Sequence, residues 1–128
     1  MNENIKILYV EDDDEIRSEL LEILKLDYSE VLVAANGEEG LALCKKHHPD
    51  IIISDIQMPK MDGLTMCRML QDENECIPMI LTTAFNESDY RKEAERLGVE
   101  AFLSKPINIT HLYSAIEDCT TKLDKGRK

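Results

Sequence analysis

The stretch that decides the fold is IIISDIQMPKMDG, residues 51–63. Its first part is an apolar run that ends in the carboxylate of Asp55, and its second part is a turn that contains Pro59 and Gly63. An apolar run followed by a Pro/Gly turn is typical of a buried strand that delivers an acid to a loop. The stretch therefore predicts a strand with a functional carboxylate at its carboxyl end.

Short apolar segments recur along the chain and alternate with amphipathic ones. We expect five strands, at about 5–10, 30–35, 50–55, 78–84 and 101–105, with helices between and after them. Strands that are apolar throughout are typical of a parallel sheet buried on both faces. The pattern predicts an α/β, flavodoxin-like fold, a (βα)5 three-layer sandwich whose parallel five-stranded sheet has the order 2-1-3-4-5.

Polar side chains stand where several of these predicted strands end. Glu11 and Asp12 follow the first strand, Asp55 ends the third, Thr83 ends the fourth and Lys105 ends the fifth. In a sheet of this order, ligands bind beyond the carboxyl ends of the strands, between strands 1 and 3. We therefore expect the three acids in one crevice, with the hydroxyl and the ammonium group at the same edge.

This set of side chains suits metal-assisted phosphoryl transfer. Three neighbouring carboxylates repel one another unless a cation binds, and all-oxygen ligation suits Mg²⁺ or Mn²⁺. Asp55 is the candidate nucleophile, which would become an aspartyl phosphate, while the metal and Lys105 would stabilise the transferring group. Asp13 or Asp14 is better explained as the cap of the first helix. Thr82 competes with Thr83, but the pleat turns the two to opposite faces.

Composition bounds the class of protein. The chain has 128 residues and a formal net charge of −11, which disfavours direct binding to nucleic acid or to an anionic membrane. We expect one domain at residues 1–123 and a tail or the start of a linker at 124–128.

The start of the chain is polar and no apolar run is long enough to span a membrane, so we expect the protein to lie in the cytoplasm. Cys44, Cys67 and Cys119 fall on apolar helix faces and are predicted to be buried free thiols.

The strand-end residues occur within four motifs that resemble the receiver domain of two-component response regulators. These motifs are Glu11-Asp12, the turn from Asp55 through Met58-Pro59 to Asp62-Gly63, Thr83-Ala84 and Lys105-Pro106. The resemblance covers nearly the whole chain. It implies that Asp55 accepts a phosphoryl group from a sensor histidine kinase or phosphotransfer protein. It further implies that Glu11, Asp12, Asp55 and the backbone carbonyl of Gln57 bind the metal.

The resemblance also assigns residues to a conformational switch and to the control of the dephosphorylation rate. Thr83 matches the switch hydroxyl, Lys105 the phosphate-pairing lysine, and Phe102 the rotating aromatic on the face formed by the fourth helix, fifth strand and fifth helix. That face is expected to change partners on phosphorylation and to support a phosphorylation-dependent homodimer. Gln57 and Phe85 match positions that tune dephosphorylation, and we expect bulky Phe85 to hinder the attacking water. Such a domain assists its own phosphorylation and dephosphorylation but is not an enzyme acting on a separate substrate.

Three other functions fit parts of the pattern. A phosphate-independent, receiver-like adaptor would share the fold, although the full acceptor set argues against it. A metal-dependent phosphatase would also use an aspartate nucleophile, but Gln57 stands where its general acid is expected. A flavodoxin-like cofactor module would need a glycine-rich phosphate loop after the first strand, where this chain has acids that would repel a phosphate.

Overall fold

A computed structural model describes residues 5–75, 77–84 and 88–126, and their side chains except at 88–89 and 123–126. Five strands alternate with five helices along the described chain. The order is β1 (Lys6–Val10), α1 (Asp14–Lys25), β2 (Glu30–Ala34), α2 (Gly37–His47), β3 (Ile51–Asp55), α3 (Gly63–Asp72), β4 (Met79–Thr83), α4 (Ser88–Arg96), β5 (Ala101–Ser104) and α5 (Ile109–Gly126). All five predicted strands are confirmed.

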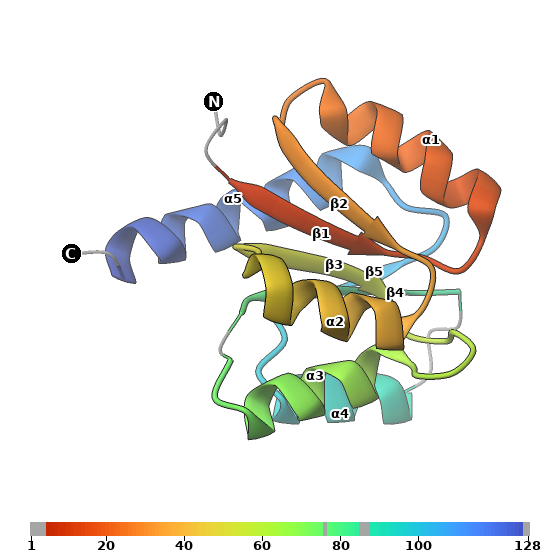
Figure 1. Cartoon of the computed structure of the whole chain (residues 1–128), viewed down its shortest axis with the longest axis vertical. Coiled ribbons are helices and arrows are strands. Elements are labelled where there is room, and N and C mark those ends of the chain that lie inside the picture. Colours follow the sequence, from red (N-terminus) through yellow and green to blue (C-terminus); the bar gives the residue numbers. More distant parts are fainter. Residues whose placement is uncertain (1–4, 76, 85–87, 127–128) are drawn as a thin grey trace.

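The strands form one parallel sheet in the order β2-β1-β3-β4-β5, as predicted. Helices cover both faces, with α1 and α5 on one side and α2, α3 and α4 on the other (Figure 1). Alternate residues of each strand enter the two cores: Ile51 and Ile53 of β3 pack beneath α1 and α5, whereas Ile52 packs on the other side. This explains why the central strands are apolar at every position rather than at every second one.

The strand register brings the polar strand ends to one edge of the sheet. Val10 pairs with Ser54, so the next residues, Glu11 and Asp55, lie side by side. Thr83 pairs with Ser104, which places Lys105 one residue beyond the end of β4. Lys105 also donates its backbone N–H to the carbonyl of Thr83 at 2.8 Å, and the Lys105–Pro106 peptide bond is cis.

Side chains and a glycine set several helix ends, and the predicted cap at the start of the first helix is among them. Asp13 caps α1 by accepting from the N–H of Ile16 at 3.0 Å, and Asn108 accepts from the N–H of His111 at the start of α5. Gly98 follows α4 with a φ of +76°, a left-handed conformation that glycine adopts without steric cost. Helix α5 stays helical to Gly126, three residues past Leu123.

The predicted thiol environments are confirmed for the described cysteines. Cys44, Cys67 and Cys119 are buried and free, and burial raises the pKa of the Cys44 and Cys119 thiols to about 12. Thiols with such pKa values are packing groups rather than nucleophiles. Cys76 lies outside the described residues. Among the described helices, none combines the length and the apolar character that crossing a bilayer requires.

The loop after β3 packs closely against the sheet and leaves no room for a side chain at Gly63. The Gly63 N–H donates to the carbonyl of Ile56 at 2.8 Å. A Cβ added at Gly63 would lie 2.4 Å from the backbone carbonyl oxygen of Asp55. Backbone cannot move aside as a flexible side chain can, so this glycine fixes how the loop leaves Asp55.

We predict that Gly63→Ala lowers the free energy of unfolding by about 1–3 kcal/mol, because the new methyl group overpacks the loop against the carbonyl of Asp55. Urea unfolding followed by circular dichroism measures the change. Gly98→Asn is the comparison at an uncrowded glycine: its Cβ would meet no atom within 4 Å, so only the smaller strain of an asparagine at positive φ is expected. Equal stability of Gly63→Ala and wild type would contradict the predicted crowding.

Candidate functional site: an acidic cluster bridged by a lysine

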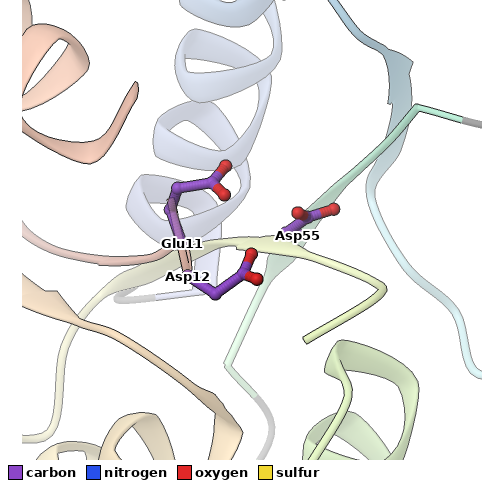
Figure 2. Close-up of side chains that lie close together, drawn as sticks. All are labelled: Glu11, Asp12 and Asp55. Carbon is purple, nitrogen blue, oxygen red and sulfur yellow. The ribbon is translucent and has the colours of Figure 1, made fainter. Parts of the chain in front are cut away.

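Three carboxylates converge where β1 and β3 end. Carboxylate oxygens of Glu11, Asp12 and Asp55 all lie within 4.8 Å of one another. Figure 2 shows that Glu11 and Asp12 come from consecutive positions after β1, while Asp55 reaches the same place from β3. The structure thus brings together the acids that the sequence predicted to share a crevice.

Lys105 bridges two of the three acids. Its Nζ lies 2.8 Å from Oε1 of Glu11 and 2.8 Å from Oδ2 of Asp55. The sequence predicted that Lys105 lies at the same edge as the acids, but its bond to Glu11 was not anticipated. Glu11 is 1% exposed and Asp55 is 6% exposed, so both bonds form away from bulk water. Charge-assisted hydrogen bonds in such surroundings are stronger than surface ion pairs.

Burial and charge act on these groups in opposite directions. Burial raises the pKa of Glu11, the negative charge of Asp55 adds to that shift, and the hydrogen bond from Lys105 opposes it. Burial tends to lower the pKa of Lys105, but its bonds to Asp55 and Glu11 outweigh burial, and the pKa is raised. Lys105 is therefore a charged donor at neutral pH, the state needed to pair with a carboxylate or a phosphoryl oxygen.

Neighbouring groups fix Glu11 but leave Asp12 free to take a ligand. Glu11 accepts from the N–H of Asp13 at 3.1 Å through Oε2, and its backbone carbonyl accepts from Arg17 at 2.8 Å. Asp12 is exposed. It faces an open hollow whose other lining residues are Gln57, Met58, Pro59 and Asp62. The donor set, with three carboxylates and one solvent-facing side, fits a hard divalent cation such as Mg²⁺.

The two threonines at the end of β4 separate as the pleat predicts. Thr82 pairs with Asp55 in the register, and its buried hydroxyl has no hydrogen-bond partner among the described residues. Thr83, buried at the next position, alternates to the other face of the sheet. Leu81 pairs with Phe102, so Thr83 and Phe102 lie on the same face, beneath α4.

Helix α4 contacts both the acidic site and Phe102, and sequence reasoning missed these contacts. The guanidinium of Arg91 lies 4.7 Å from the centroid of the half-buried Phe102 ring, a cation–π contact. The hydroxyl of Tyr90 accepts a hydrogen bond from Nε2 of Gln57 at 2.9 Å. No local pattern could have revealed these pairs, because they depend on how α4 is placed on the sheet. Phe85, predicted to tune turnover, lies outside the described residues.

Comparison with known proteins identifies one family. The profile of the response regulator receiver domain matches residues 7–117. Among the curated relatives is a probable transcriptional regulator, ycf27, of Porphyridium aerugineum. It is 33% identical over 121 residues, which make up 94% of this chain and 50% of that protein. This chain spans about half the length of the first curated relatives that it matches.

Solved structures agree with that assignment. The N-terminal domain of an uncharacterised protein from Wolinella succinogenes is 42% identical, with a TM-score of 0.88 over 94% of this chain and 98% of that one. A CheY-like receiver domain protein from Methanospirillum hungatei is 26% identical, with a TM-score of 0.88 over 95% and 98% of the two chains. With the sheet order, the clustered acids and a family match over most of its length, this chain belongs to the response regulator receiver domain family.

Proposed function

We propose that this domain is a phosphorylation-driven switch whose acceptor is Asp55. The observation that carries the proposal is the convergence of Glu11, Asp12 and Asp55, with Lys105 bonded to two of them at 2.8 Å. An oxygen of Asp55 attacks the phosphorus of a phosphohistidine on a sensor histidine kinase or phosphotransfer protein. The phosphorus–nitrogen bond breaks, the histidine leaves, and an aspartyl phosphate forms.

Each residue of the site has a separate part in this step. Glu11, Asp12, Asp55 and the backbone carbonyl of Gln57 would hold Mg²⁺, which supplies positive charge to the phosphoryl oxygens when bound. Lys105 gives up one bond to the Asp55 carboxylate and pairs with a phosphoryl oxygen instead. The domain thereby assists its own phosphorylation by the phosphohistidine donor and its own dephosphorylation. The buried, reduced thiols suit a cytoplasmic setting for this exchange.

We predict that a small-molecule phosphoryl donor adds one phosphoryl mass to the protein in Mg²⁺ and not in chelator, because charge on the transferring group must be neutralised. Intact-protein mass spectrometry measures the adduct. Asp55→Asn should take up none, whereas Asp50→Asn, which alters an acid near the opposite end of β3, should react like wild type.

An unmodified wild-type protein that is folded by circular dichroism and also fails to react with a phosphorylated histidine kinase would refute the acceptor role. That result would favour a phosphate-independent adaptor. An adduct that persists in Asp55→Asn would place the acceptor elsewhere in the chain.

The switch proposal concerns the surface formed by α4, β5 and α5. Thr83 and Phe102 share one face of the sheet, and Arg91 covers the Phe102 ring from outside. We propose that Thr83 moves toward the new phosphoryl group and that Phe102 turns inward into the space that this movement leaves. Arg91 then loses its ring contact, and the surface becomes able to bind a partner protein or a second copy of this domain.

Phosphorylation is therefore expected to shift backbone amide resonances of α4 and β5 in wild type, with smaller shifts in Thr83→Ala because the hydroxyl that links acceptor and aromatic is missing. Two-dimensional ¹H–¹⁵N NMR during steady phosphorylation measures the shifts. Ser18→Ala, which alters an exposed position of α1 on the other side of the sheet, serves as the control for loss of a hydroxyl. Equal shifts in Thr83→Ala and wild type would contradict a role for Thr83.

A further inference from the structure

Gln57 carries an exposed amide at the rim of the acidic cluster, and Tyr90 holds that amide. Nε2 of Gln57 donates to the hydroxyl of Tyr90 at 2.9 Å. The same glutamine lines the open hollow that Asp12 faces. The hydrogen bond therefore joins the mouth of the proposed phosphorylation site to α4, although the two residues are 33 positions apart in the sequence.

The Tyr90 ring is held in place by packing, which makes its hydroxyl a fixed partner for this bond. The ring is partly buried and packs against the core cluster beneath α2, α3 and α4, which includes Leu81 and Ala94. Its neighbour Arg91 holds the Phe102 ring from the same helix. Because packing already limits the motion of the ring, its hydroxyl loses little further side-chain entropy when it binds Gln57. The bond thus restrains the longer and more exposed glutamine side chain.

The position of the Gln57 amide matters for the chemistry of this site. Hydrolysis of an aspartyl phosphate requires water to add to phosphorus while the phosphorus–oxygen bond to Asp55 breaks, which yields inorganic phosphate and restores the carboxylate. Gln57 is two residues beyond Asp55, at the solvent-facing side of the cluster. A side-chain amide there can bind and orient that water if it is free to turn toward it.

We propose that Tyr90 is a positioning residue that holds the Gln57 amide on the α4 side of the hollow and so withholds it from the hydrolytic water. The proposal rests on the proposed function of Asp55 as phosphoacceptor. It makes the lifetime of the phosphoryl group depend on the position of α4. A partner protein that displaces α4 would release Gln57 and shorten the phosphorylated state, without contacting Asp55.

The test compares the decay of the phosphorylated protein in wild type, Tyr90→Phe, Gln57→Ala and the double variant. Each protein is phosphorylated with a small-molecule donor in Mg²⁺, the donor is removed, and the remaining adduct is followed by intact-protein mass spectrometry. Tyr90→Phe keeps the ring and removes only the hydroxyl, so it should accelerate decay by about 2- to 5-fold, the size expected from one modest hydrogen bond. In the Gln57→Ala background the same change should have no effect.

Tyr113→Phe is the matched control, because its hydroxyl bonds to Asp27 and to the carbonyl of Ile23 on the other side of the sheet. It should leave the decay rate unchanged. An unchanged or slower decay in Tyr90→Phe would overturn the proposal, and so would an equal acceleration in the Gln57→Ala background, which would indicate a general effect on packing. If wild type takes up no phosphoryl group from any donor, the proposed function fails and this inference fails with it.

A second measurement tests the hydrogen bond without phosphorylation. The side-chain amide resonances of Gln57, assigned by ¹H–¹⁵N NMR, should shift toward the values of a solvated amide in Tyr90→Phe and stay in place in Tyr113→Phe. Shifted resonances with an unchanged decay rate would leave Asp55 as acceptor and remove only the role of Tyr90 as positioning residue. Resonances that do not move in Tyr90→Phe would show that the hydroxyl does not hold the amide.

Discussion

Repulsion among the carboxylates of Glu11, Asp12 and Asp55 is the constraint on which the rest of this structure depends. Their oxygens lie within 4.8 Å of one another, and Glu11 and Asp55 are almost fully buried. Like charges so placed raise the free energy of the folded state. Lys105 relieves part of that cost through its two bonds, and a divalent cation would relieve more. An arrangement that is unfavourable by itself is consistent with selection for function rather than for stability.

Apolar packing on both faces of the sheet offsets the electrostatic cost of this cluster. Strands β1, β3 and β4 are buried on both faces by two helical layers, so the carboxyl edge of the sheet is free to carry charged groups. Neighbouring strands end at nearly the same level, and the residues that follow them meet without long loops. Contacts of α4 also link the acidic site to the surface around Phe102. Tyr90 and Arg91, adjacent on α4, contact the rim residue Gln57 and the half-buried Phe102 respectively.

Much of the fold and of the acidic site could be predicted from the sequence because the signals are local. Apolar runs that end in Glu11, Asp55 and Thr83 determine strand ends, and the known order of such sheets then places those ends together. The bond from Lys105 to Glu11 was missed because it depends on the positions of the two side chains at the edge of the sheet, which the sequence does not specify. Contacts of Tyr90 and Arg91 could not be predicted, since short amphipathic segments do not reveal how a helix is rotated on its sheet. The helical continuation of α5 to Gly126 could not be predicted, because Asp124 and Gly126 have low helix propensity and no apolar stripe marks the end of the helix.

Isothermal titration calorimetry with Mg²⁺ tests most directly whether the carboxylate cluster is a cation site. Wild type should bind one ion per chain, and Asp12→Asn should lose that binding, because it removes the solvent-facing member of the cluster. Asp14→Asn should bind as wild type does, since this exposed acid lies beyond the helix cap and pairs with Arg17. Absent binding to wild type, or equal binding by Asp12→Asn, would contradict the view that these carboxylates are gathered to hold a metal.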